Sequence, residues 1–222
     1  MAIMTKNVSD LVKRVTKILN DEPCIRLNMK RGLINIRALA RYIINEKKVD
    51  ATLDAVISII RRYHLKERYD IFEKARSALK NIVSISAKNQ LVAITLVKDE
   101  ETQQILPKLF SIIHYNQGDV LRIIQADQSI KIFVDRKNLD KIKGFFPEDK
   151  ILGKVSNLAE INIHVNPEDQ MPPGVCAVIT NELAVNNINI IEGMSCYPES
   201  LWFVDENAVT KAYDVICKLC NL

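Results

Sequence analysis

The residue types that could bind a small polar molecule are concentrated in two short segments near the C-terminus. The first reads Met171-Pro172-Pro173-Gly174-Val175, and the second reads Asn187-Ile188-Asn189-Ile190. Gly174 allows a ligand to approach the backbone closely, and the free N–H groups of a helix that begins there can hold a carboxylate. The amides of Asn187 and Asn189 could supply donors and acceptors for an amino group.

The loop before Gly174 adds polar and acidic side chains to this candidate site. An acidic residue among Glu168 and Asp169 could meet an ammonium group. The candidate ligand-binding set is Asn166, Gln170, Met171, Pro172, Pro173, Gly174, Val175, Asn187, Ile188 and Asn189. A simpler interpretation stays open, in which Pro172-Pro173-Gly174 is a rigid turn and the two asparagines form a helix cap and a turn.

No set of residues in the sequence meets the requirements of a catalytic or metal site. Cys217-Lys218-Leu219-Cys220 is a CxxC, but neither a second pair nor a nearby histidine completes a zinc site. The histidines at 64, 114 and 164 stand on different expected elements, and the six glycines form no phosphate-binding loop. We therefore predict a protein that is not an enzyme and that needs no cofactor and no metal.

The composition is ordinary for a soluble globular protein, with 222 residues of which 48% are hydrophobic and 26% charged. No apolar run approaches the length that spans a bilayer, and the N-terminus lacks the apolar core of a signal peptide. Five scattered cysteines suit a reducing compartment better than a disulfide framework. The sequence therefore predicts a cytoplasmic protein with no membrane partner.

The charge is distributed unevenly along the chain. Residues 1–80 carry 18 Lys and Arg against 9 Asp and Glu, whereas residues 81–222 carry 13 against 18. A basic N-terminal part on an acidic body suggests an anionic partner, of which nucleic acid is the commonest. A well-solvated helical domain that happens to be basic would show the same charge.

The periodicity of residues 1–80 is helical throughout. The expected helices are an apolar stripe from Val8 to Leu19, a short helix between Pro23 and Gly32, and residues 36–45, 51–64 and 66–80. Asn35 is expected to cap the third of these helices. Ala38–Ile43, a turn and Thr52–Val56 together resemble a helix-turn-helix.

The second helix of that motif would enter the major groove of DNA, while basic residues held phosphates. The candidate DNA-binding set is Arg37, Arg41, Lys47, Lys48, Thr52, Ser58, Arg61 and Arg62. The face of the second helix is poor in the Arg, Asn and Gln side chains that read bases. Helices with this spacing also pack in domains that bind no DNA, so both interpretations stay open.

The rest of the chain contains an internal repeat with an offset of seventy residues. When Leu91–Phe145 is placed over Ile161–Val215 without a gap, Phe133-Val134-Asp135 falls on Phe203-Val204-Asp205. Apolar positions match along the whole length. A period near seventy is too long for a solenoid and indicates a duplicated small domain.

Each repeat is expected to run strand, helix, strand, strand, helix, which matches a βαββαβ ferredoxin-like sandwich. The repeats are expected to begin with strands at 91–97 and 160–165, and the first repeat is expected to return with a fourth strand at 150–155. The second repeat ends before a fourth strand, so we expect residues 82–86 to complete its sheet, since its edge would otherwise stay unpaired. The predicted fold class is α+β. The predicted domains are a helical domain at 1–80 and two ferredoxin-like domains at 89–156 and 158–222, the first inserted in the second.

The two segments around Gly174 and Asn187 resemble the ACT domain, a family of small-molecule sensors. The Pro-Gly-Val helix start and the Asn-Ile-Asn-Ile strand carry the resemblance over residues 158–220, and the repeat extends it to 89–156. The inserted arrangement is similar to the paired ACT domains of aspartokinase regulatory regions. The resemblance implies that a small molecule, usually an amino acid, binds at the seam between paired domains.

In the first repeat the ungapped alignment places Gln104 opposite Gly174 and Asp119 opposite Asn189. That copy is expected to have lost its own site, so one ligand is expected per chain. We therefore predict a homodimeric regulator that binds a small-molecule effector and controls a DNA-binding head. The alternatives are a regulatory subunit of an amino-acid metabolic enzyme and, less favoured, an enzyme that uses the seam.

Overall fold

The computed structural model describes residues 2–63, 71–168 and 171–222, and the chain divides into two compact units. The first unit is Met1–Asp70 and the second is Ile71–Leu222. The division therefore falls ten residues before the expected end of the helical domain at residue 80. The helix that follows it packs into the core of the second unit, through Ala75 and Leu79.

The first unit is built from helices that pack around one apolar core. They are α1 (Ala2–Asp21), α2 (Pro23–Lys30), α3 (Ile36–Asn45) and α4 (Leu53–Arg62). The buried core residues are Val15, Leu19, Leu39, Ala40, Ile43, Val49, Val56, Ile59 and Ile60. Asn35 caps α3, because its side-chain oxygen accepts hydrogen bonds from the N–H groups of Arg37 and Ala38 at 3.0 and 3.1 Å. The predicted helix over 36–45 and its cap are thus confirmed.

The connection between α3 and α4 is longer than a tight helix-turn-helix turn. Residues 46–52 separate the two helices, whereas that motif commonly uses three or four residues. Helix α4 begins at Leu53 rather than Ala51, because the Thr52 hydroxyl accepts from the N–H of Ala55 and caps the helix. His64 and the beginning of the expected helix at 66–80 lie outside the described residues.

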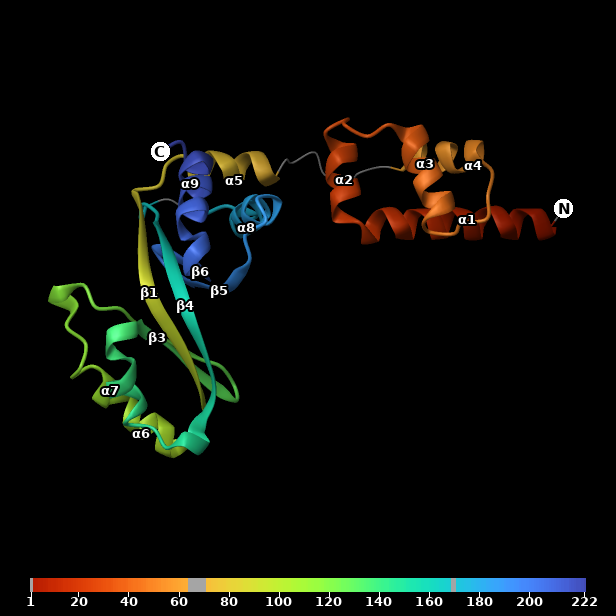
Figure 1. Cartoon of the computed structure of the whole chain (residues 1–222). Helices are drawn as coiled ribbons and strands as arrows, with labels where there is room; N and C mark the ends of the chain where they lie inside the picture. Colours follow the sequence, from red (N-terminus) through yellow and green to blue (C-terminus); the bar gives the residue numbers. More distant parts are fainter. Residues whose placement is uncertain (1, 64–70, 169–170) are drawn as a thin grey trace. The chain divides into compact units, whose positions relative to one another are not determined.

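The second unit forms one six-stranded antiparallel sheet with helices on one face (Figure 1). Its helices are α5 (Ile71–Leu79), α6 (Glu100–Leu109), α7 (Leu139–Lys143), α8 (Val175–Val185) and α9 (Val209–Cys220). Its strands are β1 (Ser84–Val97), β2 (Leu121–Gln125), β3 (Ser129–Asp135), β4 (Ile151–His164), β5 (Ile190–Cys196) and β6 (Glu199–Asp205). The order across the sheet is β2-β3-β1-β4-β6-β5.

Strands β1 and β4 run side by side through both repeats (Figure 1). The second half of β1 pairs with β3 of the first repeat, while Ser84–Lys88 pairs with Glu160–His164 and so completes the sheet of the second. The sequence suggested separate strands at 82–86, 91–97, 150–155 and 160–165. Instead each pair of expected strands is one long strand, and the pairing register shifts around Gln90 and Asn157, which both adopt φ +58°.

The helices divide between the two repeats. Helices α5, α8 and α9 cover the half of the sheet formed by β4, β6 and β5, and α6 and α7 lie over the other half (Figure 1). The first core contains Ala159, Ile161, Ile163, Trp202 and Val204 of the sheet. The second contains Val92, Ile94, Leu96, Ile132 and Val134. This layering is the mixed helix and antiparallel-sheet fold expected of ferredoxin-like repeats.

The sheet curls toward its face away from the helices, and side chains from the two repeats meet there. The rings of Phe133 on β3 and Phe203 on β6 stack with centroids 4.0 Å apart, although β1 and β4 lie between these strands. In a flat sheet three strand spacings would separate them by roughly 14 Å. The buried residues of this inner cluster are Leu91, Ala93, Val120, Phe133, Leu158, Leu201 and Phe203.

Equivalent positions of the two repeats meet inside the curl. Phe133 contacts Phe203, and Arg136 pairs with Glu206, at the offset of seventy noted in the sequence. In the first strands of the two repeats, however, Leu91 pairs with Leu158. Leu91 also pairs with Asp135 at the end of β3, and Leu158 pairs with Asp205 at the end of β6. The ungapped alignment is therefore wrong at the first strand, where the offset is sixty-seven.

Candidate functional site

The loop that leads from β4 to α8 is fastened at several points. The N–H of Val165 donates to the carbonyl of Pro198 at 2.9 Å, and the Tyr197 hydroxyl donates to the carbonyl of Pro167. Asn166 accepts from the N–H of Glu168 at 3.1 Å, and Met171 packs against the core below α8. Of the candidate binding residues, Asn166 and 171–175 therefore share this end of the second repeat, while Gln170 lies outside the described residues.

Among the described residues no side chain caps the start of α8, whereas a carboxylate fills the start of α6. Gly174 is the N-cap of α8 with φ +98° and has no side chain to accept from the first N–H groups of the helix. The N-cap of α6 is Asp99, which accepts from the N–H of Thr102 at 2.8 Å and contacts Lys150 at 2.6 Å. The Lys150 ammonium and the Thr102 N–H lower the pKa of Asp99 to about 2.

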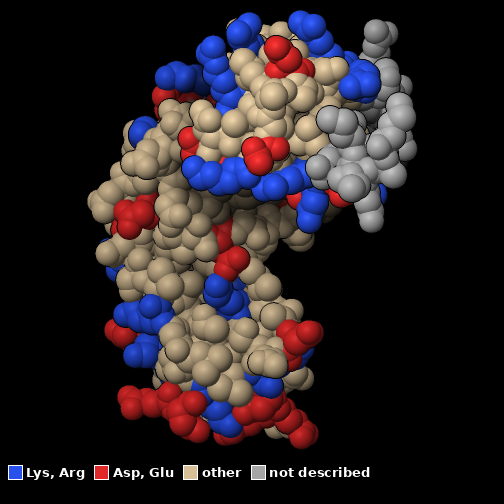
Figure 2. Space-filling model, turned by 90° about the vertical axis from the view of Figure 1, so that its right-hand side faces the viewer, with Lys and Arg blue, Asp and Glu red and all other residues tan. Residues whose placement is uncertain are grey.

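The N-caps of α8 and α6 show which residues of the two repeats are equivalent. The counterpart of Gly174 is Asp99, and Gln104 lies further along α6. The ungapped alignment fails here because residues 165–174 join β4 to α8, whereas only Lys98 and Asp99 join β1 to α6. Acidic side chains gather at this end of the first repeat, around the start of α6 (Figure 2).

The second candidate segment lies at the other end of α8. Asn187 adopts φ +56° after the last turn, and its N–H donates to the carbonyl of Ala184 at 2.9 Å. The side chain of Ile188 is buried in the core, and Asn189 is exposed. Helix α8 has 11 residues, which corresponds to about 16 Å at 1.5 Å per residue. Gly174 and Asn187 of one chain are therefore too far apart to bind the same small ligand.

The first repeat uses the residue opposite Asn189 for internal contacts. The Asp119 carboxylate accepts from the N–H of His114 and from the Asn138 amide, each at 3.1 Å, and pairs with Lys137 at 2.5 Å. The Lys137 ammonium, with the His114 N–H, holds the pKa of Asp119 well below its usual range. Both hydrogen bonds end on Oδ2, and the Lys137 ammonium lies beside Oδ1.

The inner face of the sheet is also crossed by charged pairs. Arg122 on β2 donates to both carboxylate oxygens of Glu160 on β4, at 3.1 and 3.0 Å, and Lys131 contacts Glu192 at 2.5 Å. Burial raises the pKa of Glu160, and the Arg122 guanidinium opposes that shift. These pairs and the inner apolar cluster lie on the inner face between the two repeats of one chain.

The candidate DNA-binding residues fall into two groups. Lys47 pairs with Glu22 at 2.5 Å, the hydroxyl of Thr52 caps α4, and the Ser58 hydroxyl accepts from Arg62 at 3.1 Å. The second group consists of the candidates whose exposed side chains make no such contact with the described residues, namely Arg37, Arg41, Lys48 and Arg61. Lys and Arg side chains are spread over the face of the helical unit in Figure 2.

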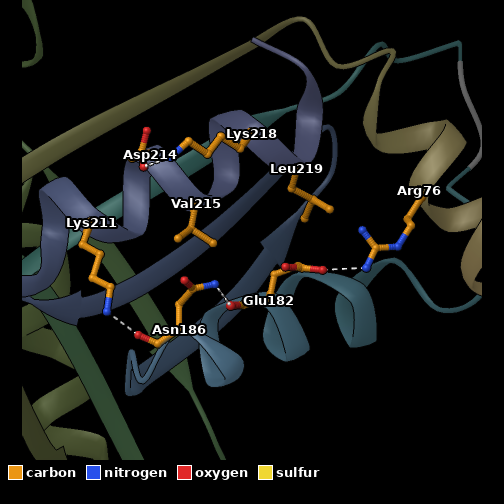
Figure 3. A pocket seen from close by; sticks show the side chains of 8 residues that line it. All are labelled: Arg76, Glu182, Asn186, Lys211, Asp214, Val215, Lys218 and Leu219. Atoms are coloured by element: carbon orange, nitrogen blue, oxygen red, sulfur yellow. Dashed lines mark hydrogen bonds and ion pairs between the residues drawn. The ribbon is translucent and has the colours of Figure 1, made fainter.

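A groove between α5, α8 and α9 has no counterpart in the sequence prediction (Figure 3). It has a volume of about 300 Å³. Its lining residues are Arg76, Glu182, Asn186, Lys211, Asp214, Val215, Lys218 and Leu219. They come from three helices that are far apart in the sequence, so no local spacing marks them as a group.

Within the described ranges, no group of His, Cys, Asp and Glu side chains is arranged to hold a metal ion. None of the helices described in the structure is long and apolar enough to cross a bilayer. Burial, aided by Cys217, raises the pKa of the Cys220 thiol to about 11. The CxxC at the end of α9 is therefore part of a packed helix and carries no reactive thiolate at Cys220.

Solved structures of other proteins share the fold of part of this chain. No family model and no curated protein matches the chain. A chain in the structure of aspartokinase alpha and beta subunits is 19% identical with a TM-score of 0.51, covering 64% of this chain and 99% of that one. Aspartate kinase from Clostridium acetobutylicum, an allosteric enzyme, is 16% identical with a TM-score of 0.52, and the match spans 64% of this chain and 35% of that kinase. This chain therefore shares a fold with aspartokinase structures, in keeping with its resemblance to ACT domains.

Proposed function

We propose that this chain is a cytoplasmic, non-enzymatic regulatory protein whose second unit binds an amino acid and whose helical unit acts on nucleic acid. The observation that carries the effector site is the start of α8 at Gly174, which no side chain among the described residues caps. In the first repeat the same position is filled by the Asp99 carboxylate. A ligand carboxylate would complete the second repeat in the same way, because the first N–H groups of a helix favour an anion.

The proposed assembly is a homodimer. The inner face between the repeats of one chain carries the inner apolar cluster and charged pairs, and α8 separates Gly174 from Asn187. A second chain would bring the Asn187–Asn189 segment of one copy to the Gly174 loop of the other. In that arrangement the ligand's carboxylate meets the start of α8 and its ammonium meets an asparagine amide or an acidic loop residue.

Gly174→Leu is expected to abolish the stabilisation that at least one amino acid gives to the intact chain. The leucine side chain blocks access to the N–H groups, and at φ +98° it also strains the backbone by about 1–2 kcal/mol. Gly118→Leu is the matched control, because Gly118 also has a positive φ of +75° and lies in the first repeat. Thermal unfolding with and without ligand measures the effect. If every amino acid changes the Tm of Gly174→Leu as much as that of Gly118→Leu, the site lies elsewhere.

The proposed nucleic-acid contact of the helical unit uses its exposed, unengaged cations. Arg37 and Arg41 lie one turn apart on α3 and would each neutralise a phosphate. The Arg37→Ala/Arg41→Ala variant is expected to reduce the slope of log K against log salt by about 2 on a DNA duplex. Fluorescence anisotropy measures this slope. Lys141→Ala/Lys143→Ala removes two exposed cations of α7 and should leave the slope unchanged; an equal reduction would contradict a specific role for the helical unit.

A second candidate function is regulation of a protein partner, such as a metabolic enzyme, by the helical unit. It is favoured by Leu33, which is 71% exposed, and by Asp54, an acidic residue in the first turn of α4 where a phosphate would approach. A complex with a protein that persists at high salt, together with no measurable affinity for DNA, would decide for this function.

A further inference from the structure

The groove between α5, α8 and α9 has a volume within the range of small-molecule sites. Its volume of about 300 Å³ is at the lower end of the range for ligand pockets. Figure 3 shows the side chains of Val215 and Leu219 pointing from α9 toward α8, where they form an apolar side of the groove. The opposite side is polar and is made by Glu182 and Asn186 of α8.

Cations stand at both ends of this polar side (Figure 3). At one end the Arg76 guanidinium contacts the Glu182 carboxylate at 2.5 Å. At the other end the Lys211 ammonium donates to the main-chain carbonyl of Asn186 at 2.5 Å. Lys211 has no carboxylate partner among the described residues, so the set of Arg76, Glu182 and Lys211 carries one net positive charge.

The two cations set where the charged groups of a fitting ligand would lie. Glu182 and Asn186 are one helical turn apart, about 6 Å along α8. A ligand with a carboxylate at each end would offer one to each cation. An ammonium between the carboxylates would meet Glu182, whose side chain is 25% exposed and therefore accessible.

We propose that this groove is a second ligand site, beyond the Gly174 loop, and that it binds a dicarboxylic amino acid. One carboxylate lies at Lys211, the other at Arg76, and the ammonium lies at Glu182. The ligand's net charge of −1 balances the charge of the three side chains, so no charge in the groove is left without a partner. The proposal rests on the proposed function in so far as both assign amino acids as the ligands of the second unit.

Arg76 adds a helix from outside the repeat to the lining of the groove. It lies on α5, which packs on α8 and α9 through Ala75 and Leu79. In the sequence α5 follows directly on the segment that leads from the helical unit. A ligand in the groove would therefore contact the first helix of the second unit as well as the repeat itself.

The test is a calorimetric titration of the intact chain with L-glutamate and L-aspartate, alongside glutarate, which lacks the ammonium, and L-glutamine, which lacks one carboxylate. At least one dicarboxylic amino acid is expected to bind at least tenfold more tightly than glutarate and L-glutamine. Lys211→Met is expected to weaken this binding at least tenfold. The matched control is Lys98→Met, because Lys98 also donates to a main-chain carbonyl, that of Ala126 at 2.8 Å, in the first repeat. It should leave the affinity unchanged.

Gly174→Leu separates failure of this proposal from failure of the proposed function. Binding that Lys211→Met weakens and Gly174→Leu preserves supports the groove. Binding that only Gly174→Leu removes overturns the groove and leaves the effector loop in place. If neither dicarboxylic amino acid binds but another amino acid does, the groove is overturned alone; if no amino acid binds, both proposals fail.

Discussion

Arg122→Met is expected to lower the free energy of unfolding by about 3–5 kcal/mol at pH 7, because it leaves the buried Glu160 carboxylate without its cation. The Glu160 side chain is only 4% exposed, and Arg122 donates to both of its oxygens. The double variant Arg122→Met/Glu160→Leu removes both charges and should recover most of the loss. Chemical unfolding followed by the fluorescence of Trp202, the single tryptophan, measures these differences.

The loss should also depend on pH. Burial already raises the pKa of Glu160 above the ordinary 4.5, and removal of Arg122 takes away the group that opposes this shift. A raised pKa in the folded state means that folding is favoured below about pH 4.5 and that this contribution is lost as the pH rises through the folded-state value. The defect of Arg122→Met should therefore shrink as the pH falls from 7 toward 4.5.

A matched control is Arg136→Met, which breaks the more exposed pair between Arg136 and Glu206. The Arg136 side chain is 44% exposed, so the expected loss in the free energy of unfolding is at most about 1 kcal/mol. Equal losses in the two variants, or a loss in Arg122→Met that does not change with pH, would contradict a buried charge pair inside the curl.

Phe203→Ala is expected to destabilise the protein by about 3–5 kcal/mol, the usual cost of removing a fully buried phenylalanine. Its ring is 0% exposed and stacks on Phe133, so the variant loses the packing that joins the two repeats. A double-mutant cycle with Phe133→Ala should give a coupling energy of about 0.5–1.5 kcal/mol. Phe110→Ala provides the same substitution at a side chain that is 56% exposed, and it should cost no more than about 0.5 kcal/mol. A similar, small cost at both positions would rule out a closed inner cluster.

The sequence predicted features that depend on neighbours along the chain. The cap of Asn35 and the bounds of α3 follow from a short polar residue before an apolar stripe, and they are confirmed. The sequence match of Phe133 and Phe203 at an offset of seventy indicated equivalent positions but did not predict a contact. In the structure the two rings stack on each other. Repeats of the same fold pack symmetrically, so equivalent positions come together.

Features that depend on insertions or on distant segments were missed. The longer loop before Gly174 shifts the alignment, so Asp99 could not be recognised as its counterpart. The Arg122–Glu160 pair depends on the curl of the sheet, which brings β2 over β4. The groove is assembled from α5, α8 and α9. Only the packing of α5 against the repeat reveals Ala75 and Leu79 as core residues of the second unit.

The most direct test of an amino-acid-responsive regulator is a thermal-unfolding screen of the intact chain against the twenty amino acids. A ligand at a hundred times its Kd adds about 2.7 kcal/mol to the free energy of unfolding. For a chain of this size, that corresponds to a rise in Tm of about 5–10 °C. We expect at least one amino acid to produce such a rise. A Tm that no amino acid changes, with no binding heat in calorimetry, would contradict the assignment of the second unit as an amino-acid sensor.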